Sequence, residues 1–353
     1  LGANVEVVSS LSKEWKASSG IEFYHDQVGS KSETTNLETG EYYQTRGLYP
    51  DGSTYDNFAV YTLHNYDLNK WNFSAGLRYN FVQLQLEDTT FGNTTIKPDA
   101  LVGNFGVVYK MNPYHHLTAN INSAFRAPNI NDVSSFGVAD FRYEVPAYDL
   151  KPETSWNKEI GYKIRYEGFS GTVHFFHNKL NNLIANVPGD YNGLDSLDGY
   201  KVYKRENINE AVMYGGEVEL EARLTNSIIG FGNMAYIHGQ NISNDEPMRR
   251  IPPLNGRIGL RGNFIRHFSI MADWVFAADQ DRLSSGDMAD DRIAEGGTSG
   301  WNIFNIYGGY DHPYFSINAS LQNLFDEAYR VHGSGIDGIG RSFWVSLKIN
   351  INP

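Results

Sequence analysis

Residues 341–351 read RSFWVSLKINI, and from Phe343 onward every second residue of this stretch is apolar. Side chains of a β-strand point alternately to its two faces, so the stretch predicts a strand with one apolar and one mainly polar face. The same alternation recurs in residues 315–322 and 217–224. In the second of these, three glutamates and an arginine share one face. Because such charges cannot face lipid, we expect that face to line a wet interior.

Segments with this alternation predict about 15 strands. They lie near residues 3–11, 14–27, 55–66, 70–87, 98–110, 115–126, 153–166, 169–181, 200–224, 228–240, 255–264, 268–280, 299–311, 314–323 and 341–351. Tight turns alternate with long polar loops along the chain, and aromatic residues flank the tight turns. Both features are typical of an outer-membrane β-barrel with an interfacial aromatic girdle. A soluble sheet with cross-strand aromatic pairs is the alternative.

The composition excludes several classes of protein. Of the 353 residues, 29 are Lys or Arg and 41 are Asp or Glu, giving a net charge of −12 that argues against nucleic-acid binding. There is no cysteine, hence no disulfide or thiolate metal site, and no apolar run long enough for a transmembrane helix. No hydrolase, metalloprotease or nucleotide-binding motif is present. We therefore expect no enzyme activity, no catalytic residue, no metal site and no cofactor.

Two pairs of motifs resemble a known family. FRAPN at 125–129 is followed by DLKPE at 149–153, and NLFDEAYR at 323–330 is followed by Gly340-Arg341 and the last strand. These motifs and their order resemble TonB-dependent outer-membrane receptors, especially those for haem and iron chelates. The resemblance covers residues 1–353 and implies the C-terminal portion of an antiparallel transmembrane β-barrel, with about 15 strands of a 22-stranded barrel. The odd strand number is consistent with a missing beginning, because single-chain bacterial barrels have an even number of strands.

The resemblance also implies a function. It indicates an active transporter in the outer membrane of a Gram-negative bacterium that imports a bulky metal chelate, with a ferric siderophore as the first expectation. A haem or cobalamin importer of the same family is an alternative, and a surface glycan-binding β-protein without transport is an alternative of another class. The implied partners are the metal-chelate ligand, outer-membrane lipid, and TonB of the inner-membrane energising complex. TonB would act through a plug and TonB box in an N-terminal part that the chain lacks.

The candidate ligand-binding residues lie in predicted outer loops. The loop that joins the first motif pair carries Phe141, Arg142 and Tyr143, and Arg126 stands at its beginning. Arginine can pair with a carboxylate or catecholate, and tyrosine can stack on an aromatic chelate, although packing of the loop explains both equally well. The loop at 28–54 adds Tyr42, Tyr43 and Arg46, which suit an aromatic anion or, alternatively, are interface tyrosines beside a solvated arginine.

Two further loop features have open interpretations. His332 lies in an outer loop, where it is a candidate to contact a haem, since histidine is a usual axial ligand. A second loop carries an acidic run that predicts either a calcium site or, in the plainer interpretation, a solvated loop. The run comprises Asp279, Asp281, Asp287, Asp290 and Asp291.

Overall fold

The computed structural model describes residues 1–208, 210–265 and 267–350. Within these ranges, seventeen strands belong to one sheet, and two of them are short, β7 (Thr94–Ile96) and β19 (Glu246–Pro247). The other fifteen are β1 (Gly2–Ser10), β2 (Trp15–Gln27), β5 (Thr54–Leu68), β6 (Trp71–Leu86), β8 (Asp99–Lys110), β9 (His115–Arg126), β12 (Glu153–Tyr166), β13 (Phe169–Asn181), β17 (Ala211–Arg223), β18 (Ile228–Asn241), β20 (Asn255–Ile265), β21 (Phe268–Ala277), β22 (Trp301–His312), β23 (Phe315–Gln322) and β24 (Ser342–Ile349). The predicted all-β class is confirmed, and Ile351 of the last predicted strand lies outside the described residues.

One predicted strand was wrong in its extent. The stretch 200–224 forms two strands, β16 (Tyr200–Asn207) and β17, rather than one. The first of them pairs with loop strands, antiparallel to β14 (Ile184–Pro188) and parallel to β11 (Arg142–Val145). At its end, the Asn207 side chain donates to two backbone carbonyls, those of Lys151 and Asn182, at 2.8 and 2.7 Å. These long-range bonds end the strand where alternation alone would continue it.

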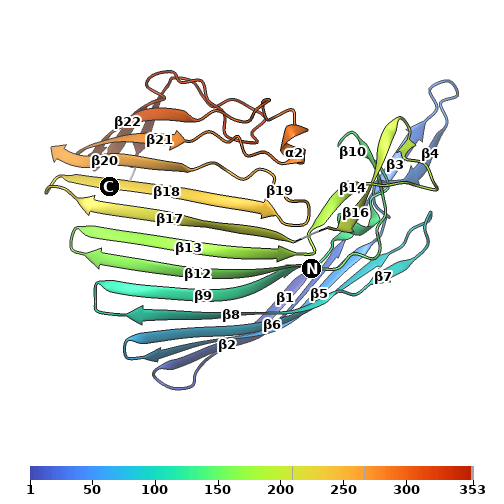
Figure 1. Cartoon of the computed structure of the whole chain (residues 1–353), viewed down its shortest axis with the longest axis horizontal. Helices are drawn as coiled ribbons and strands as arrows, with labels where there is room; N and C mark the ends of the chain where they lie inside the picture. Colours follow the sequence, from blue (N-terminus) through green and yellow to red (C-terminus); the bar gives the residue numbers. More distant parts are fainter. Residues whose placement is uncertain (209, 266, 351–353) are drawn as a thin grey trace. The chain divides into compact units, whose positions relative to one another are not determined.

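The chain divides into two compact units, and the first comprises residues 1–107, 120–157 and 179–211. In unit 1, β1 pairs with β2, β2 with β5, and β5 with β6, all antiparallel (Figure 1). Its long connections carry the hairpin β3 (Lys31–Thr35) to β4 (Tyr42–Arg46), the helix α1 (Ile130–Ser134), and a small sheet. That sheet contains β10 (Gly137–Ala139), β11, β14, β15 (Ser196–Leu197) and β16. Alternation could not reveal these short elements.

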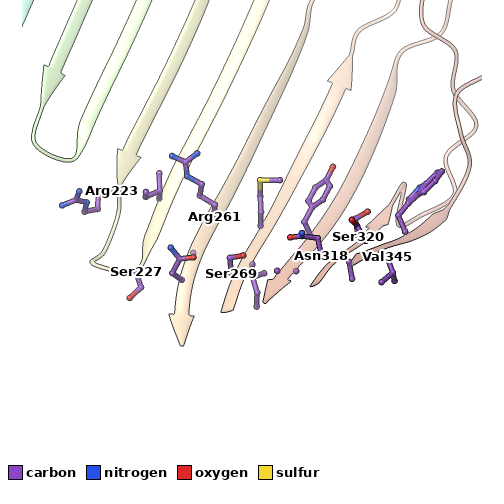
Figure 2. A pocket seen from close by; sticks show the side chains of 18 of the residues that line it. Arg223, Ser227, Arg261, Ser269, Asn318, Ser320 and Val345 are labelled. Atoms are coloured by element: carbon purple, nitrogen blue, oxygen red, sulfur yellow. The ribbon is translucent and has the colours of Figure 1, made fainter. Parts of the chain in front are cut away.

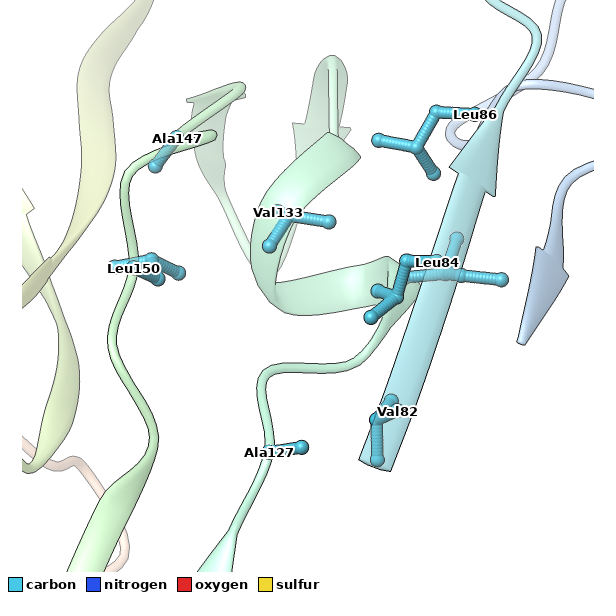
Figure 3. Packing of buried hydrophobic residues seen from close by; sticks show 8 residues of the cluster. Val82, Leu84, Leu86, Ala127, Val133, Ala147 and Leu150 are labelled. Carbon is cyan, nitrogen blue, oxygen red and sulfur yellow. The ribbon is translucent and has the colours of Figure 1, made fainter. Parts of the chain in front are cut away.

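A compact apolar cluster holds the 127–152 loop against β6. Val82, Leu84 and Leu86 are at most 1% exposed, and they pack against residues of α1 and of the chain on either side of it (Figure 3). The loop side contributes Ala127, Ile130, Val133, Ala147 and Leu150. Burying one Val or Leu side chain contributes about 1.5–3 kcal/mol. The cluster therefore makes this loop an ordered part of unit 1.

The second unit comprises residues 108–119, 158–178 and 212–353, of which the structure describes all but 266 and 351–353. It contains an antiparallel series in which β18 pairs with β20, β20 with β21, and β21 with β22 (Figure 1). The series continues with β23 and β24, each paired with the strand before it. The register of β23 and β24 places Ile317 opposite Leu347 and Asn318 opposite Ser346. Apolar residues thus pair on one face and polar residues on the other, as the alternation predicts.

Short and long connections segregate in both units. In unit 1, β1–β2 and β5–β6 are joined by tight turns, whereas residues 28–53, 87–98 and 127–152 are long connections. In unit 2, tight turns follow β12, β17, β20 and β22, whereas residues 242–254, 278–300 and 323–341 are long. The long connection at 278–300 carries the helix α2 (Ser285–Met288). This segregation agrees with the predicted barrel pattern.

Aromatic rings gather beside the tight turns, as an interfacial girdle requires. In unit 1, Trp15 lies with its ring centroid 6.3 Å from that of Tyr66. In unit 2, Tyr310 contacts Phe268 at 4.7 Å and Phe315 at 5.9 Å, across three neighbouring strands. None of the helices in the described part of the chain is long and apolar enough to cross a bilayer.

Candidate functional site

The two motifs that bracket the 127–152 loop meet in unit 1. Arg126, the last residue of β9, donates from Nε to Oε2 of Glu153 at 2.6 Å. Glu153 is the first residue of β12, and its other carboxylate oxygen accepts from the backbone amide of Ile184 at 2.8 Å. Because charge-assisted hydrogen bonds are the strong ones, this pair closes the base of the loop.

Helix α1 fixes the second partner of Arg126. The Asn129 side chain accepts from the backbone amide of Asp132 at 2.9 Å, and the Asp132 side chain accepts from the amide of Asn129 at 3.0 Å. This capping box aims Asp132 at Nη1 of Arg126, at 2.6 Å. An amide side chain followed three residues later by a carboxylate is a signal that the sequence contains and that the strand-based prediction did not use.

A chain of alternating charges continues from Asp132 into the small sheet. Its other oxygen accepts from Nη1 of Arg205 at 3.0 Å, and Nη2 of Arg205 lies 3.5 Å from Glu144, which is only 5% exposed. The other oxygen of Glu144 lies 3.5 Å from Nε of Arg142. Two predicted site residues, Arg126 and Arg142, are thereby connected through Asp132, Arg205 and Glu144. The prediction missed Asp132 and Arg205.

Arg46 is buried rather than solvated. Its side chain is 8% exposed and donates from Nη2 to Asp88 at 2.7 Å, and the Asp88 side chain is completely buried. Burial alone would raise the pKa of Asp88, but hydrogen bonds from Arg46 and from the backbone of Thr90 and Phe91 outweigh it and hold that pKa below its usual range. The plainer interpretation of Arg46 as a solvated arginine is therefore wrong.

Aromatic rings connect Arg46 with Tyr143. The Arg46 guanidinium lies 5.6 Å from the ring of Phe136, and that ring contacts Tyr143 edge-on at 5.4 Å. Phe91 and Tyr191 complete the cluster, at 4.9 and 5.4 Å from Phe136. Burial raises the pKa of the Tyr143 hydroxyl, so it is a neutral hydrogen-bond donor at neutral pH.

Three of the predicted residues are free surface side chains. Phe141 is 93% exposed and has a positive φ of 59°, so it stands at the tip of the β10–β11 turn. Tyr42 and Tyr43 are 70% and 56% exposed on the β3–β4 hairpin. Arg142 is partly covered, because it lies 3.4 Å from Asp140 and 5.7 Å from the ring of Tyr203.

His332 lies in unit 2, in the 323–341 connection. Its Nδ1 is 2.9 Å from the hydroxyl of Thr298, and its Nε2 is buried with no hydrogen-bond partner among the described residues. Burial lowers the pKa of this imidazole, so the ring is neutral at neutral pH. It belongs to a different unit from the other seven predicted residues.

Both interpretations of the acidic run are wrong for its central residues. Asp290 is 8% exposed and binds Arg249 at 2.6 Å, Arg250 at 2.8 Å and Arg292 at 2.7 Å. Asp287 is 1% exposed, and its side chain accepts a hydrogen bond from the backbone amide of Ser284, the N-cap residue of α2. Arginines rather than calcium or water therefore neutralise these carboxylates. Within the described ranges, no three His, Asp or Glu side chains are placed so that they could hold a metal ion together.

Asn323, the first residue of the last motif, fixes the beginning of the 323–341 connection. It is 2% exposed with a positive φ of 51°, and its side chain exchanges hydrogen bonds with the backbone of Glu327 at 2.8 Å. Its own amide donates to Asn305 Oδ1 at 2.9 Å, and Asn305 donates to the buried Asp273 at 2.8 Å. The motif thus anchors a loop to β21 and β22.

The wall of unit 2 carries a hollow near the tight turns. A cavity of about 670 Å³ is lined there by mainly polar and small side chains, including Arg261, Ser269, Asn318 and Ser320 (Figure 2). Asn318 and Ser320 come from the polar face of β23. A polar wall of this kind is expected of a wet barrel interior.

Comparison with known proteins identifies the family. Residues 4–324 match the family model described as "TonB dependent receptor-like, beta-barrel". The match covers most of the chain, so the chain belongs to this family and is part of its β-barrel domain. It is therefore part of an outer-membrane receptor of a Gram-negative bacterium, in a family of receptors rather than enzymes.

Named relatives and solved structures agree with this assignment. The chain is 26% identical over 254 residues to the "Iron-regulated outer membrane virulence protein" of Vibrio cholerae, covering 69% of this chain and 38% of that protein. It is 26% identical over 264 residues to the "Ferric enterobactin receptor" of Pseudomonas aeruginosa, covering 65% and 35%. The solved structure of "Copper transporter OprC" superposes with a TM-score of 0.82 at 19% identity, covering 98% of this chain and 55% of that one. The chain thus spans about half or less of the proteins it matches.

Proposed function

We propose that the complete protein is a TonB-dependent active transporter that imports a ferric siderophore across the outer membrane. The observation that carries this proposal is the family match over residues 4–324 together with relatives named for iron regulation and for ferric enterobactin. Import of a bulky chelate needs a wide barrel whose lumen is closed by a movable plug. We infer that the plug and the TonB-contacting segment belong to the part of the relatives that this chain does not span.

The ligand-contacting surface in this proposal is formed by the long connections of unit 1, residues 28–53, 87–98 and 127–152, which we call the loop side. Phe141, Tyr42 and Tyr43 offer exposed aromatic rings there, and the partly buried Arg142 and Tyr143 follow Phe141 in β11. Arg126 and Arg46 support the proposal in a different way, because their ion pairs hold the loops that carry those rings. Rings on an ordered loop bind an aromatic or apolar chelate with little loss of conformational entropy.

A haem importer of the same family is the second candidate. One relative, 23% identical over 361 residues and covering 89% of this chain, is named "TonB-dependent heme receptor A" in Haemophilus ducreyi. His332 supports this candidate, since its Nε2 atom has no hydrogen-bond partner among the described residues. A cobalamin importer and a glycan-binding surface protein remain as weaker alternatives, because no residue of the described loops favours either.

The experiment is an uptake assay on the full-length receptor in a Gram-negative host that lacks its own siderophore receptors. We expect radioactive iron to enter when it is supplied as a siderophore chelate, and entry to stop when the host's tonB gene is deleted. Haem and cyanocobalamin are supplied in parallel. Uptake of haem alone would replace the siderophore proposal, and uptake that persists without TonB would contradict active transport.

A further inference from the structure

A second, unpredicted cavity lies in unit 1, between the end of β2, the beginning of β5 and the beginning of α1. Its volume is about 370 Å³, within the range of roughly 300–1,000 Å³ that is typical of small-molecule sites. It is lined by Asp26, Val28, Tyr49, Tyr55, Asn129, Ile130 and Asn131. We call it the Asp26 pocket, because Asp26 is the one charged residue in its lining.

The register of the sheet places the charge beside an aromatic ring. Asp26 on β2 is directly opposite Tyr55 on β5, so the two side chains project from the same face of the sheet. On the loop side, the hydroxyl of Tyr49 donates to Oδ1 of Asn131 at 3.3 Å. The same oxygen accepts from the hydroxyl of Ser135 at 2.8 Å, which fixes this wall.

The Asp26 carboxylate has no partner in the described part of unit 1. No hydrogen bond or ion pair engages it, and it is exposed. Its sequence neighbour His25 is already bound to Asp56 at 2.6 Å, and Arg126 is already bound to both Asp132 and Glu153. The negative charge at the pocket is therefore not neutralised by the chain itself.

Conversely, unit 1 offers no free guanidinium to a negatively charged ligand. Its five arginines are Arg46, Arg78, Arg126, Arg142 and Arg205, and each forms an ion pair with a carboxylate. A polyanionic chelate that bound one of these guanidinium groups would have to compete with its carboxylate partner, and several of the pairs are largely buried. Breaking a buried pair is strongly unfavourable, because it leaves a buried charge without a partner.

We propose that the Asp26 pocket binds a positively charged ammonium group of the ligand, so that the receptor takes cationic chelates in preference to polyanionic ones. This inference rests on the proposed import function and names the charge class of its substrate. An ammonium group placed here donates charge-assisted hydrogen bonds to Asp26, and the rings of Tyr49 and Tyr55 add the attraction of an aromatic face for a cation. The net charge of −12 also attracts cationic ligands over longer distances.

The pocket is tested directly with a small probe on the purified full-length receptor. Tyramine carries an ammonium group, and 4-ethylphenol has nearly the same shape without the charge. We expect calorimetry to detect saturable binding of tyramine, with affinity at least about tenfold above that of 4-ethylphenol. Asp26→Asn should abolish this difference. Glu41→Gln removes the same charge from an exposed side chain outside the pocket and should leave the difference intact.

The substrate class is tested with three ferric chelates. Ferrioxamine B has a free ammonium group, its N-acetylated form is neutral, and ferric enterobactin is an anion. We expect the receptor to bind ferrioxamine B about tenfold more tightly than the acetylated form, and this preference should vanish in Asp26→Asn. Tightest binding of ferric enterobactin, or equal effects of Asp26→Asn and Glu41→Gln, would overturn the inference. If no chelate binds while tyramine still discriminates between the variants, the import function fails and the pocket stands.

Discussion

The guanidinium of Arg46 contacts the completely buried carboxylate of Asp88 at 2.7 Å, although the two residues are 42 positions apart in the sequence. Arg46 also donates to the backbone carbonyls of Leu48 and Ser134, at 3.0 and 2.8 Å. One side chain thus joins three connections of unit 1. The order of the loop side depends on this arrangement more than on any exposed contact.

Replacing Arg46 by Met should loosen these loops while leaving the strands assembled. The change leaves the buried carboxylate of Asp88 without its charged partner, at a cost of about 3–5 kcal/mol. Hydrogen exchange should accelerate in residues 28–53 and 87–98 but not in β5 or β6. Lys31→Met is the control, because Lys31 meets Asp51 only at 3.9 Å on the surface, where a pair contributes about 0–1 kcal/mol. Equal exchange in both variants would contradict the role of Arg46.

The loops of unit 1 should also open in acid. The pKa of Asp88 lies below its unfolded value of about 3.9, so the stabilisation is fully present above that pH and is lost as the pH falls through the lower, folded value. Digestion with pepsin should therefore leave residues 28–53 intact near pH 5 and cleave them progressively below pH 4. Asp88→Asn removes the titrating group. An identical acid profile in that variant would show that another group governs opening.

Substitutions on the two faces of β24 should differ in their effect on assembly. Leu347 pairs with Ile317 on the apolar face and Ser346 with Asn318 on the polar face. Arginine at Leu347 should cost about 2–4 kcal/mol in the middle of the membrane, whereas arginine at Ser346 should be tolerated. Heat-modifiability on gels reports assembly of the full-length receptor. Equal tolerance of the two variants would mean that the faces are wrongly assigned.

Asn323→Ala should release the 323–341 connection. The substitution removes the side-chain bonds to the backbone of Glu327 and Ile339 and places alanine at a positive φ. Each lost hydrogen bond costs about 0.5–1.5 kcal/mol, and the backbone conformation costs a further 1–2 kcal/mol or so. Limited proteolysis should cleave within this connection first. Asn323→Gly also lacks the side-chain bonds but avoids the backbone strain, so its rate of cleavage should lie between those of the wild type and Asn323→Ala. Cleavage of both variants at the wild-type rate would exclude an anchoring role of Asn323.

Changing Arg142 and Tyr143 together to Ala should weaken uptake without affecting barrel assembly. Both side chains belong to β11, which is part of the small sheet formed by the long connections and not of the seventeen-stranded sheet. Uptake of the ferric siderophore is measured at several concentrations, and outer-membrane content of the receptor is measured in the same cells. Thr34→Ala is a loop control on the exposed hairpin. Unchanged uptake kinetics in the double variant would remove this loop from the ligand site.

The sequence predicted the strands well because each strand carries its own two-residue period. Fifteen segments are predicted, and among them only the segment 200–224 is wrong in kind, because it forms both β16 and β17. The loop side was predicted poorly, because its elements depend on partners far away in the sequence. β11, for example, pairs on one side with the three-residue strand β10 and on the other with β16, about 60 residues later. The ion pairs of Arg46 and Arg205 also join residues far apart in the sequence. For Arg46, residue type alone suggested a ligand-binding or a solvated arginine.

The bond between Arg126 and Glu153 gives the 127–152 loop a fixed pair of ends. The chain between these residues departs from β9 and returns to β12 at one place, so the exposed tip around Phe141, which lies outside the buried cluster, can change without shifting either strand. The tip around Phe141 can then be exchanged for a foreign peptide, provided that the bond between Arg126 and Glu153 is kept.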